Sequence, residues 1–305
     1  MNARKFPRFS VKRKVYYAVQ SKNLVHRTDA RWQAYLPLVP AIAFLAVFLV
    51  APLIATVWSS LSPNAVVKFE GHGFGNYGYL FGKAYYIDTI VRTLRIALVV
   101  TVIALLVGYP AAYFLRDLSE RIGSTMIIVL TFPILTGPLI VVLGWMILLS
   151  DGGPLIHPLT QLGWLKPLKL LGTETAIVIG LVHFTLPFVV LTVFSSMKQI
   201  PEDLLEAARS LGAGPLQVLY RVVWPLTLPG VLSATLIAFS LAASAYISPH
   251  YLGGPTQLVL TTLVGQFILA TFNSELASAA AILLLVLMAA IIFAFTAFVS
   301  RRIRG

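Results

Sequence analysis

The sequence predicts an all-α integral membrane protein with six transmembrane helices. Of its 305 residues, 58% are hydrophobic and 11% are charged, whereas soluble chains carry roughly 25% charged residues. A helix needs about 20 consecutive apolar residues to cross the hydrocarbon core of a bilayer. The predicted spans are residues 36–58, 93–115, 124–149, 175–197, 229–247 and 276–299.

The basic residues indicate how the chain crosses the membrane. Seventeen of the 23 Lys and Arg residues lie before the first span, after the second, before the fifth, or in the tail. Because loops rich in Lys and Arg usually face the cytoplasm, both termini are expected there. The net charge of +12 follows from this topology and from attraction to anionic lipid, at roughly 1 kcal/mol per basic residue. Nucleic acid is therefore not an expected partner.

The chain divides into a basic cytoplasmic arm, residues 1–34, and one membrane domain, residues 35–305. The arm includes FPRFSVKRKVYYAV (residues 6–19), whose aromatic residues beside charges fit either a segment lying on the membrane surface or a disordered tail. No cleavable signal is expected, because about 35 residues precede the first apolar run. The chain has no cysteine, which excludes thiolate catalysis and disulfides.

The third predicted span is interrupted near mid-depth by Gly137 and Pro138. A proline inside a helix removes a hydrogen bond and bends the helix. In a membrane, such breaks are tolerated where protein or a water-filled cavity covers the backbone. Gly137 and Pro138 are therefore candidate residues of a translocation path.

Ser240, Ser244 and Ser248 recur at i, i+4 and i+8 in and just after the fifth span. That spacing predicts one small, mildly polar helix face. Such a face either packs closely against another helix or lines a solute path, and both alternatives stay open. Together with Tyr246, the three serines complete the candidate path.

Catalytic chemistry is not indicated. The sequence lacks HExxH, GxSxG and Walker A motifs, and the centres of the spans contain no Asp, Glu, Lys or Arg. His183 is the single titratable residue at mid-span, and we expect it to be a hydrogen-bonded packing residue rather than a proton carrier. No catalytic or metal-binding residue is predicted. A secondary transporter would need inverted repeats and mid-membrane ion ligands, and neither is visible.

The polar stretch EDLLEAARSLGAGPLQVLYRVVWPLTLPG, residues 202–230, separates the fourth and fifth spans. We expect two short helices with a turn at Gly212, a residue suited to the left-handed position after a helix. Pro201 should be the first residue of the first helix, and Pro225 should end the second. The two expected apolar stripes are Leu204, Ala208 and Leu211, followed by Leu216, Leu219 and Val223. Charges exclude this stretch from lipid, so the stripes predict a docking element for a cytoplasmic partner.

Within this stretch, a 20-residue pattern resembles the EAA loop (EAA-x3-G-x9-I-x-L-P) of binding-protein-dependent ABC importer permeases. The matching positions are Glu206-Ala207-Ala208, Gly212 and Val222-Val223-Trp224-Pro225, with Val222 in place of Ile and Trp224 in place of Leu. Further stretches are similar to the first permease subunit of the spermidine/putrescine-type branch. They are GNYGYLF (75–81), GYPAAYFL (108–115), TFPILTGPLI (131–140) and SPHYLGG (248–254).

The resemblance implies a type I ABC importer permease fold in the bacterial inner membrane, with residues 198–228 as the loop that couples to the ATPase. The implied coupling residues are Glu206, Ala207, Ala208, Arg209, Gly212 and Pro225. The implied partners are a second permease subunit forming a heterodimer, two cytoplasmic ATPases, a periplasmic solute-binding protein and membrane lipid. The chain itself would be no enzyme and would bind no cofactor, because ATP and Mg belong to the ATPase.

The same resemblance favours a polyamine-like solute, with an amino-acid derivative or another small organic ion as the alternatives. Tyr246, Tyr251 and Trp145 could present aromatic faces to a cation. Arg92 and Arg95, at the outer mouth of the second span, argue mildly against a cation.

Overall fold

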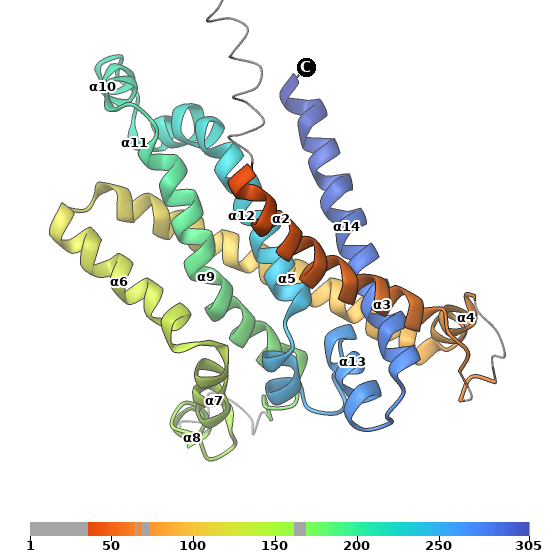
Figure 1. Ribbon diagram of the computed structural model, residues 1–305. Coiled ribbons are helices and arrows are strands. Elements are labelled where there is room, and N and C mark those ends of the chain that lie inside the picture. The colour runs from red at the N-terminus through yellow and green to blue at the C-terminus, as the bar shows by residue number, and fades with distance from the viewer. Residues whose placement is uncertain (1–35, 65, 69–72, 162–168, 305) are drawn as a thin grey trace, which may run out of the picture. The chain divides into compact units, whose positions relative to one another are not determined.

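The computed structural model describes residues 36–64, 66–68, 73–161 and 169–304, and nearly all of these are helical (Figure 1). The chain divides into two compact units, residues 1–58 and 59–305. The basic arm lies outside the described residues, so the expectation for it stays a prediction.

The described part of the first unit is one apolar helical run. It begins with a 3₁₀ turn at Leu36–Leu38, continues as α2 (Val39–Leu45), widens into a π turn at Ala46–Val50 and proceeds as α3 (Ala51–Ser60). The stretch Val39–Ser60 is 22 residues long, which is enough to cross a bilayer. The first predicted span is confirmed.

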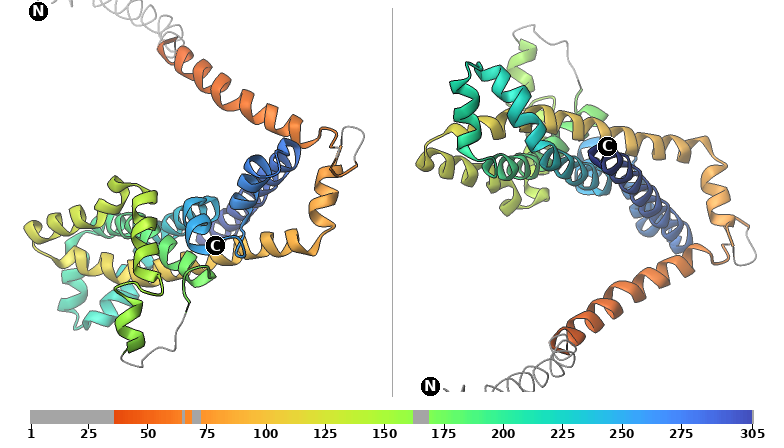
Figure 2. Two further views of the ribbon diagram at one scale, coloured as in Figure 1. Left: turned by 90° about the horizontal axis from the view of Figure 1, so that it is seen from below. Right: turned by 90° about the horizontal axis from the view of Figure 1, so that it is seen from above.

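The second unit contains the remaining helices, shown from three directions in Figures 1 and 2. Within the described residues of this unit, four helical runs are long and apolar enough to cross a membrane, and the bent pair α6 and α7 adds one further span if it is counted as one. The helices are α4 (Gly75–Phe81), α5 (Ala84–Asp117), α6 (Glu120–Thr136), α7 (Pro138–Leu149), α8 (Ile156–Gln161), α9 (Glu174–Lys198), α10 (Glu202–Ser210), α11 (Pro215–Val218), α12 (Trp224–Ser244), α13 (Leu260–Leu269) and α14 (Ser274–Arg304).

The core of this unit is formed where α5, α9 and α12 pack together. Every fourth residue of one face of α12 is small and buried, through Gly230, Ala234, Ala238 and Ala242. On α5, a β-carbon added to Gly108 would lie 2.7 Å from Val189 Cγ1 of α9. Small residues let helix backbones approach closely, which is the main source of helix association in lipid. The closest packing of α12 in the core is therefore made by this Gly/Ala face, and the two alternatives for the serines stay open.

The third predicted span is broken between α6 and α7, which meet at an angle of 96° (Figure 1). Gly137 joins them with φ +79°, a backbone conformation that is costly for residues with a β-carbon. Pro138 begins α7, where its missing N–H leaves no helical hydrogen bond unmade. The expected interruption at Gly137 and Pro138 is confirmed.

The ten-residue helix α13 was not predicted, because it is too short for the length rule that identifies spans. It packs through Leu260, Leu263 and Phe267 in a buried cluster with residues of α14 and α5. The second span is longer than predicted, because α5 continues for 34 residues.

Candidate functional site

The polar stretch folds as two helices joined by a tight turn, as predicted. In α10, Glu202 and Asp203 occupy the first turn, where a carboxylate favours the positive end of the helix dipole. Pro201 precedes the helix with extended backbone angles, φ −59° and ψ 136°, so its prediction as the first helical residue is wrong by one position. A proline in the preceding position still costs no helical hydrogen bond, because the first N–H groups have no partner in the helix.

The turn at Gly212 has the predicted left-handed backbone, with φ +82°. The Gly212 N–H donates to the Arg209 carbonyl at 2.9 Å, and the Ala213 N–H donates to the Ala208 carbonyl at 3.1 Å. This pair of hydrogen bonds is the Schellman motif, which satisfies carbonyls left free at a helix end. Pro215 then starts α11, and the Gln217 side chain accepts the Gly214 N–H at 3.2 Å.

The two predicted apolar stripes are not the buried faces. In α10, Leu205 is 5% exposed and packs in the core, whereas Leu204 is 48% exposed and Leu211 is 89% exposed. The reason is that α10 ends at Ser210, so Leu211 leaves the helical face, and the helix lies on the core through Leu205 and the partly buried Ala208.

The second stripe is split in the same way. Val223 and Val218 are buried, Leu219 is partly buried, and Leu216 is 69% exposed. Three leucines between α10 and the start of α11, at positions 204, 211 and 216, therefore remain exposed around the turn.

Pro225 does not end the second helix, contrary to prediction. The segment Pro215–Ser244 is one helical run of 30 residues. A π turn at Leu219–Val223 directly precedes the proline, and the Trp224 N–H bonds to the Leu219 carbonyl five residues back. In this wider turn the N–H groups bond five residues back instead of four, which lets the helix continue past the proline. The same succession of π turn and proline occurs at Ala46–Val50 and Pro52.

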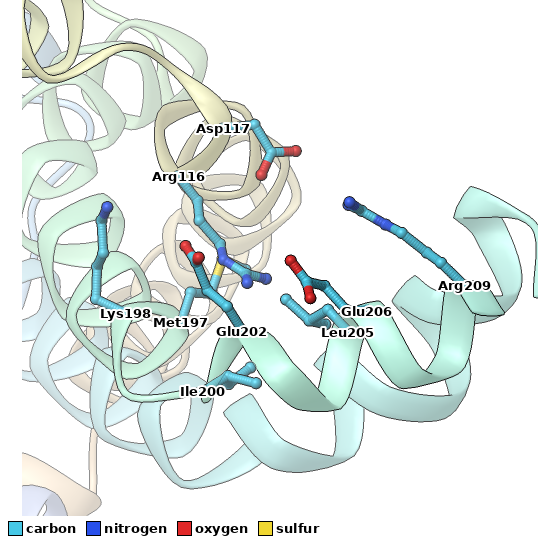
Figure 3. Close-up of a pocket in the computed structure, with 9 residues that line it drawn as sticks. All are labelled: Arg116, Asp117, Met197, Lys198, Ile200, Glu202, Leu205, Glu206 and Arg209. Atoms are coloured by element: carbon cyan, nitrogen blue, oxygen red, sulfur yellow. The ribbon is translucent and has the colours of Figure 1, made fainter.

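A cleft of about 200 Å³ lies beside α10, where the ends of α5 and α9 approach it (Figure 3). Its apolar lining is Met197, Ile200 and Leu205, and its charged lining is Arg116, Asp117, Lys198, Glu202, Glu206 and Arg209. The guanidinium of Arg116 points toward the carboxylates of Glu202 and Glu206 (Figure 3). Sequence reasoning used Arg116 only for topology, because nothing in its local sequence shows that the end of α5 approaches α10.

Of the predicted coupling residues, Glu206 and Arg209 line this cleft, and the others do not. Ala207 and Arg209 are exposed, Ala208 is partly buried against the core, and Pro225 is exposed in the continuous helix. Their role in coupling stays a prediction.

The fifth span ends at Ser244, so Ser248 does not share a helix face with Ser240 and Ser244, contrary to prediction. Ala245 is extended, with ψ 131°. Pro249 supplies the physical reason: it has no N–H to bond the carbonyl of Ala245, and its ring would crowd that carbonyl in a helix. The Ala245 carbonyl instead accepts the hydroxyl of Thr261 at 2.7 Å.

The two helix breaks meet at a pocket of about 210 Å³. Four of the predicted path residues line it, namely Pro138, Ser244, Tyr246 and Ser248. Gly137 adjoins Pro138, whereas Ser240 lies one turn away, where its carbonyl accepts the Ser244 hydroxyl at 2.7 Å. The rest of the lining is Val141, Val142, Gly180, Leu181, Phe184, Leu241, Ala245 and Ile247. We call this site the break pocket.

His183 is hydrogen-bonded and partly buried, as predicted. It accepts the indole N–H of Trp145 through Nδ1 at 2.9 Å. The rings meet edge to face, with centroids 5.7 Å apart. This contact joins α7 to α9.

We call α10, Gly212 and α11 together the polar turn. At the opposite end of α5 and α9 from it, two arginines are paired with carboxylates. Arg92 approaches Asp88 at 2.5 Å and Glu174 at 3.1 Å, and Arg95 approaches Glu174 at 2.5 Å. Arg92 also donates to the carbonyls of Thr256 and Leu258 at 3.4 and 3.3 Å. The two carboxylates offset the positive charge of Arg92 and Arg95. These arginines therefore no longer argue against a cationic solute.

Arg92→Leu is expected to destabilise the protein more than Arg95→Leu. The Arg92 side chain is 16% exposed and that of Arg95 is 59% exposed. Hydrogen bonds to charged groups contribute about 1.5–3 kcal/mol each when shielded, whereas exposed pairs contribute roughly 0–1 kcal/mol. Thermal melting of the detergent-solubilised protein measures the difference. Equal losses in the two variants would contradict this ranking.

Known proteins share both the sequence pattern and the fold. Residues 101–305 match the family described as binding-protein-dependent transport system inner membrane component. The chain is 34% identical over 221 residues to the spermidine/putrescine transport system permease protein PotB of Haemophilus influenzae, covering 72% of this chain and 77% of the relative. It is 32% identical over 230 residues to PotB of Salmonella typhimurium, covering 74% and 80%.

A solved structure supports the same fold. A chain from the crystal structure of a bacterial alginate ABC transporter in complex with alginate pentasaccharide-bound periplasmic protein superposes with a TM-score of 0.75 at 19% identity, covering 90% of this chain and 96% of that one. The similarity in sequence and the arrangement of broken apolar helices lead to one conclusion. The chain belongs to the family of inner membrane components of binding-protein-dependent transport systems.

Proposed function

We propose that this chain is the permease subunit of an ATP-driven importer that receives a polyamine-like organic cation from a periplasmic binding protein and passes it into the cytoplasm. The observation that carries the solute class is the 34% identity, over 72% of the chain, to a permease named for spermidine and putrescine. An amino-acid derivative or another small organic ion is the alternative.

The electrostatics of the break pocket support a cation. The α12 helix ends at Ser244, in the lining of the pocket, and the carboxyl end of a helix carries roughly half a negative charge. Tyr246 and Phe184 line the same pocket and offer aromatic faces, which attract cations. The amino end of α7 also reaches the pocket, at Pro138, and its positive dipole end opposes that of α12, so the aromatic faces carry the preference for a cation.

The polar turn supports an ATPase partner. Leu204, Leu211 and Leu216 are exposed on it, while Leu205 and the Schellman turn hold the two short helices in place. A partner surface that covers these leucines would gain roughly 1.5–3 kcal/mol per fully buried side chain. We propose that two ATPases supply the ATP and Mg sites, that a second permease completes the path, and that the polar turn and both termini face the cytoplasm.

Accessibility of single cysteines tests the proposed path, since the native chain has none. We expect Ser244→Cys, which lines the pocket and is exposed, to react with a water-soluble maleimide. Ser248→Cys, at a position 5% exposed, should react only in a second nucleotide state of the complex. If both cysteines stay inert in every state, the break pocket is not part of the path.

The solute class is tested by uptake into proteoliposomes that contain the complete transporter. Radiolabelled putrescine and spermidine should enter in the presence of ATP and binding protein, and unlabelled polyamines should compete. Entry of an amino-acid derivative with no competition from polyamines would replace the solute proposed here while retaining the permease role.

A further inference from the structure

We infer that the hydrogen bond between Trp145 and His183 is a latch that holds α7 against α9 and so sets the shape of the break pocket. Both are positioning residues, which act through the placement of α7. The inference deepens the proposed function and rests on it in one respect, namely that the break pocket belongs to the solute path.

The latch adds a directional contact to a short helix that otherwise has few buried residues. It is joined to α6 by the single glycine Gly137, at a 96° bend. Only two of its twelve residues, Val142 and Leu149, are buried. Val142 and Leu149 pack with Ala176 of α9 and with Leu252, and in lipid such packing acts together with hydrogen bonds between helices. A directional contact then favours one orientation of α7.

The hydrogen bond supplies that direction. An indole N–H can only donate, so Nδ1 of His183 must accept, and the proton of the neutral ring lies on Nε2. The donor–acceptor distance of 2.9 Å is normal for a hydrogen bond, and the two rings meet in the favourable edge-to-face arrangement. An imidazole committed to accepting through Nδ1 must stay uncharged, which fits the expectation that His183 is not a proton carrier.

The latch lies at the edge of the break pocket. Trp145 follows Val141 and Val142 of the lining by one helical turn, and His183 stands between Gly180 and Phe184, which also line the pocket. The pocket is thus walled by α7 on one side and α9 on the other, and the latch joins these walls directly. A small swing of α7 about Gly137 would open or close the space between them.

The test compares variants that remove or preserve the hydrogen bond in the reconstituted transporter. Trp145→Phe removes the donor, and His183→Leu removes the acceptor. His183→Asn keeps an acceptor, because its amide oxygen falls near the place of Nδ1. Each single variant that removes the hydrogen bond is expected to lower uptake between roughly twofold and tenfold. The double variant Trp145→Phe/His183→Leu should lower uptake no further than either single variant. His183→Asn should keep near-native uptake.

Uptake is normalised to the amount of assembled complex, so a folding defect does not count as loss of the latch. The inference is overturned if Asn is as damaging as Leu at position 183, if the two single losses add, or if no variant lowers uptake. Maleimide reactivity of Ser244→Cys separates this from the proposed path. If Ser244→Cys reacts, but its reaction rate is the same with Trp145→Phe as without it, the latch alone is overturned. If Ser244→Cys stays inert while the uptake of the Trp145 and His183 variants follows the expected pattern, the path alone is overturned.

Discussion

Gly212→Val is expected to abolish solute uptake while leaving the chain inserted in the membrane. Gly212 has φ +82°, and nothing lies within 4 Å of the position of an added β-carbon. The β-carbon therefore meets no neighbour, but the left-handed backbone costs a residue with a β-carbon about 1–2 kcal/mol, and more if it is β-branched. That strain is too small to unfold the helical core. It is large enough to disturb the Schellman hydrogen bonds and mis-orient α10 relative to α11.

The measurement is reconstituted uptake together with ATPase activity, normalised to the ATPase subunit that co-purifies. Uptake should collapse, with the ATPase either lost on purification or hydrolysing ATP without response to solute. Gly214→Ala is the matched control, because Gly214 has φ −69° and an equally open surrounding, and it should behave as native. Native uptake by Gly212→Val at normal ATPase stoichiometry would show that the turn does not position a docking element.

Gly230→Val is expected to prevent accumulation of folded protein. A β-carbon at Gly230 would overlap the Ser196 side chain and lie 3.6 Å from the Thr192 carbonyl oxygen, so α12 and α9 would have to separate. Their contact is part of the central core, where forced overpacking typically costs about 1–3 kcal/mol or more. Membrane protein level and thermal melting after detergent extraction measure the effect.

Gly144→Val provides the control for this prediction. Gly144 is also a helical glycine of an apolar segment, yet nothing lies within 4 Å of the position of its β-carbon. It should be obtained at native level with native stability. If Gly230→Val reached the same protein level and melting temperature as Gly144→Val, the close packing of α9 and α12 would not be essential to the core.

Much of the fold could be predicted because lipid imposes simple rules on local sequence. Apolar length identified the spans, and Gly137, Pro138 and Gly212 act through their own backbone, so their neighbours are not needed to predict the breaks. Pro225 failed as a helix end for the opposite reason. Whether a proline ends a helix depends on the hydrogen bonds around it, and the π turn at Leu219–Val223 has no distinctive sequence pattern.

The candidate site was less predictable because its contacts join residues distant in sequence. Arg116 approaches α10, Trp145 bonds to His183, and Arg92 pairs with Glu174. Each pair joins two different helices, and helical periodicity predicts contacts only within one helix. Leu205 rather than Leu204 is buried, since the neighbouring helices decide which face of α10 is covered. The 3.6-residue period predicts that a face exists but not which way it points.

The unbroken helix Pro215–Ser244 has a mechanical consequence. Its 30 residues follow a helical path of about 45 Å at 1.5 Å per residue. One end adjoins the turn at Gly212, and the other end lies in the lining of the break pocket at Ser244. Between residues 231 and 244 the helix contains neither glycine nor proline. The stiff part is therefore the half next to the pocket. The other half contains the π turn at Leu219–Val223, Pro225 and the Pro229-Gly230 pair, which are the places where helices bend, so a displacement of the polar turn is transmitted to the pocket by residues 231–244 acting as one rigid rod.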